Sequence, residues 1–180
     1  MDNESESGLK FTLNCDTTVN VQRNTGNNYS TVSLVVHPVP STSPIITYTG
    51  EWLDSEEEDN YWSSYMNGTF HSTQDYGATA TLRFNGSAVY IFGSRRPDRG
   101  EYAVDLDGLT TTASGYSNNL TFNVTLFSAT DLDDTEHQVA LKNMFSSPAA
   151  AWVDLNYVVV TSGDGNPQYV LFAFPVQTIQ

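Results

Sequence analysis

The sequence has a single cysteine, Cys15, among 180 residues. One cysteine allows neither an intramolecular disulfide nor a cysteine-based zinc site. Because free cysteines are usually buried, we expect Cys15 to be a small apolar side chain in the interior. If the protein is secreted, pairing of this thiol with a second molecule is the alternative.

Positive charge is also scarce. Seven Lys and Arg stand against 21 Asp and Glu, which gives a formal net charge of −14 and a pI near 4.2. A field of that sign repels nucleic acid and anionic membranes, so the composition excludes both as electrostatic partners. A glycan or a cell-surface protein remains as the expected partner.

Long apolar runs are missing as well. No run approaches the 18 residues that a transmembrane helix needs, and the N-terminal letters MDNESESG lack the basic and apolar regions of a signal peptide. We therefore expect an extracellular protein or the ectodomain of an anchored one, with no direct membrane insertion. Asn-X-Ser/Thr sequons favour secretion, and the expected glycosylation sites are Asn28, Asn67, Asn85, Asn119 and Asn123, with a sixth sequon at Asn3.

What the sequence does have is short alternating segments separated by turn signals. Residues 78–84 (ATATLRF) alternate apolar and polar side chains, as do 102–108 and 120–127, and the segments 137–143 and 151–160 complete the series of expected strands. Asn85-Gly86 is the pair most typical of a type I′ turn, so we expect a hairpin between 78–84 and the SAVYIFG strand that follows. Asp107-Gly108 predicts a second turn of this kind.

Alternating strands without helices between them must pack sheet on sheet, so the pattern predicts an all-β fold, an antiparallel β-sandwich of the jelly-roll type. We expect its core to span 45–162. Residues 1–44 hold two possible edge strands of the same sandwich (9–22 and 30–40), and 163–180 a C-terminal strand that packs on it, because 168–179 is too apolar for a free linker.

Five segments occur in the order and spacing of a known family: ITYTGEW (46–52), NGTFHST (67–73), GATATLRFNGSAVYIFGSRRPDRGEYAVDLDG (77–108), LFSATDLDDTEHQVALKN (126–143) and WVDLNYVVV (152–160). The chain resembles a largely uncharacterised cell-surface domain of mushroom-forming (basidiomycete) fungi. That resemblance implies a jelly roll of the galactose-binding-domain-like type. It also implies the superfamily's range of roles: carbohydrate-binding modules, adhesion domains and appendages of enzymes.

The arginines gather at one point of the chain. Arg95, Arg96 and Arg99 lie within five positions, in a connection whose Pro97 and Asp98 suit a β-turn. We expect the three side chains to project around the tip of this loop. They either pair with nearby acids such as Asp98, Glu101 or those of the 54–59 run, or hold an acidic sugar or an acidic patch of a partner.

Aromatic residues form two candidate ligand-binding groups. Trp52, Trp62 and Tyr65 lie near one another in the sequence, and sugar rings stack on exposed aromatic faces. Tyr116 with Asn118 forms a second group of the same kind. The alternatives are that the tryptophans fill the core or cover an open end of the sandwich, and that Tyr116 belongs to an ordinary turn.

The acidic run DSEEED (54–59) has the oxygen ligands that Ca²⁺ takes, and Asp54, Glu56 and Asp59 are the candidates. The alternative is a solvated charge run, since the spacing is not that of an EF-hand. The superfamily resemblance implies a structural calcium nearer the first and last strands, with ligands that the sequence does not reveal.

Catalytic motifs are lacking. There is no Gly-X-Ser-X-Gly elbow and no His-Glu-X-X-His helix, and His71 is the one histidine to watch. A glycosidase needs two facing carboxylates, but Asp105 and Asp154 lie opposite the apolar face of their strands, where we expect solvent. The sequence therefore favours a non-catalytic, lectin-like carbohydrate-binding module. A structural or adhesion domain is the alternative, and a glycan-active hydrolase the second.

Overall fold

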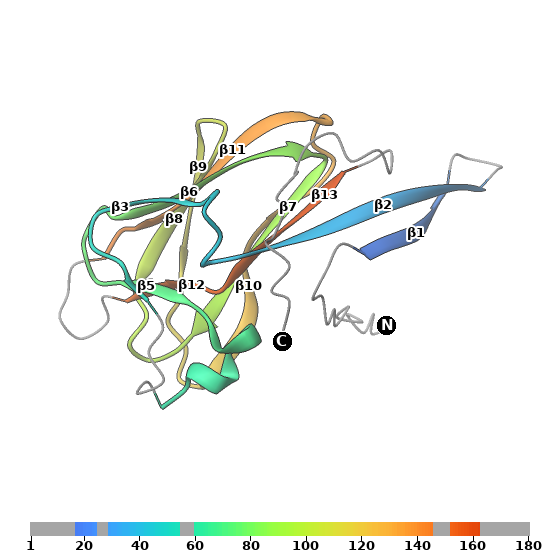
Figure 1. Ribbon diagram of the computed structural model, residues 1–180. Coiled ribbons are helices and arrows are strands. Elements are labelled where there is room, and N and C mark those ends of the chain that lie inside the picture. The colour runs from blue at the N-terminus through green and yellow to red at the C-terminus, as the bar shows by residue number, and fades with distance from the viewer. Residues whose placement is uncertain (1–16, 25–28, 55–59, 146–151, 163–180) are drawn as a thin grey trace, which may run out of the picture.

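The computed structural model describes residues 17–24, 29–54, 60–145 and 152–162 (Figure 1). These residues form β-strands and two single-turn 3₁₀ helices, with no α-helix among them. The elements are β1 (Thr17–Asn24), β2 (Tyr29–Pro40), β3 (Thr47–Thr49), β4 (Leu53–Asp54), η1 (Trp62–Ser64), η2 (Met66–Gly68), β5 (His71–Thr73), β6 (Thr79–Gly86), β7 (Ala88–Arg95), β8 (Glu101–Leu106), β9 (Leu109–Ser114), β10 (Thr121–Ala129), β11 (Thr135–Asn143), β12 (Val153–Leu155) and β13 (Tyr157–Ser162).

The strands pair into two five-stranded sheets and one small sheet. The first sheet has the order β1-β2-β13-β7-β10, the second β3-β6-β11-β8-β9, and the third β12-β5-β4. Every pairing within them is antiparallel. The predicted fold class, an all-β antiparallel jelly roll, is confirmed.

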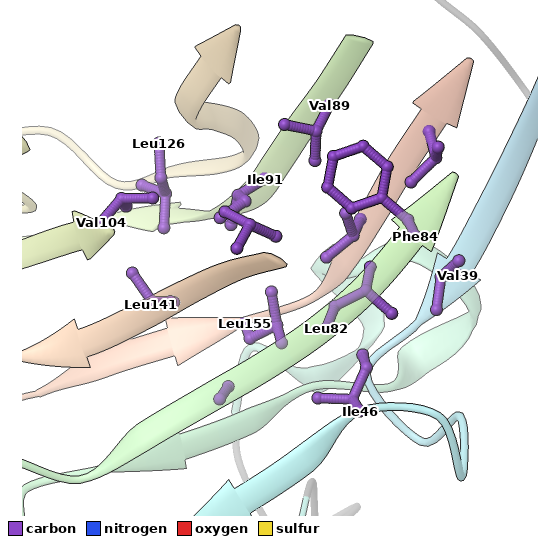
Figure 2. Packing of buried hydrophobic residues seen from close by; sticks show 14 of the residues in the cluster. Val39, Ile46, Leu82, Phe84, Val89, Ile91, Val104, Leu126, Leu141 and Leu155 are labelled. Atoms are coloured by element: carbon purple, nitrogen blue, oxygen red, sulfur yellow. The ribbon is translucent and has the colours of Figure 1, made fainter. Parts of the chain in front are cut away.

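The core lies between the first and second sheets (Figure 2). Leu82 and Phe84 on β6 are buried, while Arg83 between them is exposed. The apolar residues of 78–84 therefore face the sandwich interior, and the polar residues between them face its surface. Val89 and Ile91 on β7 face them from the first sheet. Each such side chain contributes about 1.5–3 kcal/mol when fully buried, which makes this cluster the main source of stability.

The first sheet is apolar on its outer face as well. Val36 and Val159 are buried there in a cluster of their own, with Tyr90, Phe92 and Tyr157 packed against them. The rings of Phe92 and Tyr157 stack with centroids 4.4 Å apart. β7 and β13 therefore carry apolar residues at nearly every position, which is why 157–160 (YVVV) shows no alternation.

The N-terminal strands belong to the first sheet. β2 pairs with β13 between Val35 and Pro40, and among the described strands β1 pairs with β2 alone, at the edge of the sheet. In Figure 1 the two strands reach beyond the rest of the sandwich as a ribbon. The segments 1–16 and 163–180, with Cys15 and the proposed C-terminal strand, lie outside the described residues.

One local prediction is wrong. β6 and β7 form no hairpin, because β6 pairs with β11 and β3 in the second sheet while β7 pairs with β13 and β10 in the first. Asn85 and Gly86 are the last residues of β6, opposite Glu136 and Thr135, and neither has a positive φ. The chain crosses between the sheets at this point. The Asp107-Gly108 turn is confirmed, with φ of 52° and 87° joining β8 to β9.

Candidate functional site

The arginine segment begins where β7 ends. Arg95 is the last residue of the strand, and a turn follows in which the Arg99 amide donates to the Arg96 carbonyl at 3.2 Å. The backbone of Arg96 is bonded on both sides to the β9–β10 loop: its amide donates to the Gly115 carbonyl, and its carbonyl accepts from the Ser117 amide. Two loops therefore lie side by side at this end of the sandwich.

The expectation that all three arginines project from a loop tip is wrong for two of them. Arg95 is exposed, but Arg96 is 9% and Arg99 4% exposed. The turn is bonded to the segment before β12, because the Trp152 amide donates to the Asp98 carbonyl and the Gly100 amide to the Trp152 carbonyl. These bonds fold the turn inward and carry both side chains under the surface.

Arg99 enters a buried network centred on Asp154. Its Nη2 and Nε lie 2.6 and 3.0 Å from Asp154 Oδ2, which also accepts from the hydroxyls of Tyr65 and Ser94, each at 2.5 Å. The Ser94 amide donates to Asp154 Oδ1 at 2.7 Å. Asp154, expected in solvent, is 1% exposed. β12, in the third sheet, packs against the end of β7, and this packing buries the Asp154 carboxylate.

The electrostatics of this network keep Arg99 charged and the Tyr65 hydroxyl protonated. Burial alone would lower the pKa of Arg99, but the attraction of Asp154 raises it above its ordinary value. Burial, followed by the charge of Asp154, raises the pKa of Tyr65 to about 12, so its hydroxyl stays a donor at neutral pH. Tyr65 and Arg99, both candidate ligand contacts in the sequence, are thus buried and bonded to Asp154.

Arg96 lies in a different environment. Its guanidinium stacks over the ring of Tyr61, with Cζ 4.7 Å from the centroid, and lies 5.9 Å from the centroid of Phe122. Its Nη2 donates to Asp98 Oδ2 at 3.2 Å, and Arg99 Nη1 lies 3.2 Å from the same oxygen. The Nε and Nη1 atoms of Arg96 are buried without a hydrogen-bond partner.

Exposed polar and aromatic groups surround Arg96. The Tyr116 side chain is 54% exposed, and its hydroxyl donates to Asn118 Oδ1 at 2.7 Å. Arg95 makes no ion pair with any residue that the structure describes. We define the arginine face as Tyr61, Arg96, Tyr116, Asn118 and Phe122. It combines a buried cation with an exposed tyrosine and amide.

Asn123 positions Tyr61 by holding the two 3₁₀ helices against β10. Its Nδ2 donates to the Ser64 carbonyl at 2.9 Å, and its Oδ1 accepts from the Met66 amide at 3.0 Å. Asn123 has a φ of 54° and lies at a register shift of β10. The nitrogen that would carry a glycan at this sequon is therefore engaged. Asn67, Asn85 and Asn119 are exposed, and Asn28 lies outside the described residues.

The two tryptophans do not join the arginines in one surface. Trp52 packs against the main core, with its ring 5.1 Å from that of Tyr48 and its Nε1 donating to the Thr49 carbonyl at 3.1 Å. Trp62 lies against Gly68, where a Cβ would collide with its ring. The alternative in which the tryptophans fill space fits these contacts better than an aromatic platform does.

The acidic run is described only at Asp54, since Glu56 and Asp59 fall outside the described residues. Asp54 Oδ1 lies 2.6 Å from His71 Nε2, and the His71 ring stacks on Tyr48 at 4.7 Å. In the described part of the chain, no three acidic, His or Cys side chains gather closely enough to hold a metal. Nor does any helix there have the length and apolar content to span a membrane.

Sequence reasoning missed Tyr61, Phe122, Ser94 and Asp154 as neighbours of the arginines. Alternation placed Phe122 on the inward face of its strand, but no local pattern pairs residues 60 positions apart, as Ser94 and Asp154 are. Of the acids considered for catalysis, Asp105 holds the β8–β9 turn, accepting from the Gly108 amide and the Thr110 hydroxyl at 2.9 Å each.

No family model matches the sequence, and no curated protein matches it significantly. Among solved structures, a two-domain esterase active on acetylated mannans matches with a TM-score of 0.54 and 12% identity, over 71% of this chain and 36% of that chain. A family two carbohydrate esterase from Cellvibrio japonicus matches with a TM-score of 0.52 and 16% identity, over 72% and 34%. The carbohydrate-binding module CBM36 in complex with calcium and xylotriose matches more loosely, with a TM-score of 0.43 and 10% identity over 69% and 98%.

At identities this low, the two matches show a shared fold and nothing more. The chain spans about a third of the length of each (36% and 34%), so the match is to a part of those enzymes. The resemblance to a fungal cell-surface family stays a prediction. What the comparisons establish is the fold of this chain, a β-sandwich that also forms part of these two structures.

Proposed function

We propose that the protein is a non-catalytic carbohydrate-binding module that holds a glycan on the arginine face. The observation that carries the proposal is the exposed Tyr116 ring, whose hydroxyl is bonded to Asn118 and whose backbone pairs with that of Arg96. A tyrosine face stacks on a sugar ring, and amide and guanidinium groups bond its hydroxyls. The fold shared with parts of carbohydrate esterases agrees with this role.

We also propose that the protein works outside the cell, secreted or as the ectodomain of an anchored protein. Its support is the number of sequons and the exposure of Asn67, Asn85 and Asn119. Structural calcium is part of the same proposal. Expression in a eukaryotic secretory host followed by peptide mapping should find glycans on these three asparagines; their absence there would refute the extracellular assignment.

The binding role is tested with Tyr116→Ala on an array of fungal, plant and bacterial glycans, followed by titration calorimetry on the best ligand. We expect at least about a tenfold loss of affinity, since stacking contributes about 0.5–1.5 kcal/mol beyond area burial. Tyr76→Ala is the matched control, because Tyr76 is 59% exposed but lies in the turn before β6. Unchanged binding by Tyr116→Ala, or no hit on the array, would overturn the proposal.

A protein-interaction or adhesion domain is the second candidate. The ribbon of β1 and β2 favours it, because β1 leaves one edge unpaired among the described strands and such an edge can add a strand from a partner. Deleting residues 17–34 would abolish adhesion or pull-down of a partner under this reading, while glycan binding at the arginine face would persist.

A further inference from the structure

The outer face of the first sheet carries a second apolar cluster, away from the arginine face. Val36 and Val159 are buried in it, and Tyr90, Phe92 and Tyr157 pack against them. Directly paired residues on neighbouring strands point to the same side of a sheet, and Val159 is paired with Tyr90 and Tyr157 with Phe92. We define the outer apolar face as these five residues. Soluble proteins rarely leave an apolar patch of this kind uncovered.

β2 extends this face with further uncharged residues. Pro38 is paired with Val159 and Pro40 with Tyr157, so both prolines lie on the outer side of the sheet. The chain has 21 Asp and Glu, yet none of the residues that these pairings place on this side is charged. A surface without charge in so acidic a chain is suited to apolar contact.

The orientation of the rings indicates what covers the face. The rings of Phe92 and Tyr157, on neighbouring strands, stack on each other with an interplanar angle of 11°. Two rings that stack side by side within one layer stand upright and present their edges outward. A sugar ring stacks on the flat face of an aromatic ring, whereas apolar side chains can pack between upright rings. The outer apolar face therefore suits a segment of polypeptide.

β13 brings a suitable segment to this place. It lies in the middle of the first sheet and ends at Ser162. Residues 163–167 (GDGNP) are turn formers, and residues 169–174 (YVLFAF) are all apolar. Five residues reach at most about 17 Å, which exceeds the spacing of about 10 Å between packed β-layers. Six extended residues then span the length of β13, itself six residues long.

We propose that residues 169–174 of this chain dock on the outer apolar face as an extended segment that runs antiparallel to β13. The inference is independent of the proposed glycan binding. A second copy of the chain is the weaker competitor for the face, because two molecules with a net charge of −14 repel each other. The segment is joined to β13 by five residues, so its effective concentration at the face is high.

Proximity is tested on the full chain by NMR with a nitroxide on Ala173→Cys, in a Cys15→Ser background. The label should broaden the amide signals of β7 and β13 far more than those of β6 and β8, because the second sheet lies about 10 Å deeper. The same label on Arg83→Cys, at an exposed position of β6, is the control and should give the reverse pattern. The reduced label supplies the reference spectrum.

Charge placed in the segment should undock it. Leu171→Asp combined with Phe172→Asp should raise the fluorescence of the apolar probe ANS at least about threefold, because the rings of the outer face become accessible. It should also remove the broadening caused by a label on Ala173→Cys. Gln177→Asp combined with Thr178→Asp adds the same charge outside the segment and should change neither signal. Thermal melts show that both variants fold.

Three results would overturn the inference. Equal broadening of the two sheets, or none, would show that the segment does not dock on the face. Broadening that vanishes when the labelled chain is diluted with unlabelled chain would assign the face to a second copy. Broadening confined to β1 and β2 would place the segment at the edge of the sheet instead of on its face.

Discussion

Arg96 and Arg99 show how two neighbouring residues of one type take different roles. Arg99 meets Asp154 with two donors and lies among hydroxyls that complete the carboxylate's bonds. Arg96 has one bond to a shared carboxylate and aromatic rings on its faces. A fully bonded charge is costly to disturb, whereas a partly bonded one can still accept a ligand. Arg99 is therefore paired within the interior, whereas the Nε and Nη1 donors of Arg96 have no partner.

Replacing Asp154 tests the structural role at the residue scale. Asp154→Asn should lower the free energy of unfolding by about 3–5 kcal/mol, because it leaves the Arg99 guanidinium buried without its counter-charge. Glu136→Gln is the control: it breaks the exposed pair with Arg83 and should cost at most about 1 kcal/mol. Urea unfolding measures both. Equal stability of the two variants would show that the buried pair contributes no more than a surface one.

At the scale of elements, the crossing from β6 to β7 places the arginine segment. The Ser87 amide donates to the Thr161 carbonyl at 2.7 Å, so the crossing passes directly over the end of β13. A Cβ on Gly86 would lie 2.5 Å from that same carbonyl oxygen. Only glycine allows this approach, and β7 then runs along the first sheet to deliver Arg95 and Arg96 beside β10.

Gly86→Ala should therefore destabilise the fold by about 1–3 kcal/mol, the usual cost of overpacking. Asn85→Ala, at the exposed neighbouring position, should change stability by at most about 0.5 kcal/mol. Thermal melts followed by circular dichroism compare the two. If Gly86→Ala melts with the wild type, the close approach of strands at the crossing is not a constraint on the fold.

At the scale of the whole molecule, the His137 side chain, near the start of β11, links the β8–β9 turn to the loop before β11. Its Nδ1 lies 2.6 Å from Asp107 Oδ2 in the β8–β9 turn, and its Nε2 lies 2.7 Å from the Asp133 carbonyl before β11. Both ring nitrogens face acceptors, which suits the protonated ring. Partial burial would lower the pKa of His137, but the bonds to Asp133 and Asp107 raise it above its ordinary value.

A histidine whose folded-state pKa is raised stabilises the fold fully below its unfolded pKa of about 6.5, and this contribution is lost as the pH rises through the folded value. Stability should therefore fall as the pH rises above about 6.5. His137→Asn should flatten this decline, and the difference in melting temperature between the two proteins should be largest near pH 6. His71, whose burial lowers its pKa, acts in the opposite direction and is unaltered in both. A constant difference across this range would contradict the prediction.

Local patterns were enough for the class of fold and for the strands β6, β7, β8, β10, β11 and β13, whereas β4, β5 and β9 were not expected. The alternation in 78–84 and the Asp107-Gly108 turn follow from side-chain period and from backbone sterics, which act over a few residues. The same local logic was wrong at Asn85-Gly86. That pair suits a hairpin turn, but the apolar faces of β6 and β7 are buried better when the strands lie in opposite sheets.

The site depended on tertiary structure. Composition singled out the three arginines, but their burial follows from the bonds between the turn and Trp152, and the partner of Arg99 is 55 positions away. A charged side chain is buried only where an opposite charge from a distant part of the chain pairs with it. No local sequence pattern indicates such a pair. The sequence by itself determined the strands, the sandwich and the arginine-rich connection. The packing of β12, η1 and β10 around that connection decided which arginine pairs with Asp154 and which one stacks on Tyr61.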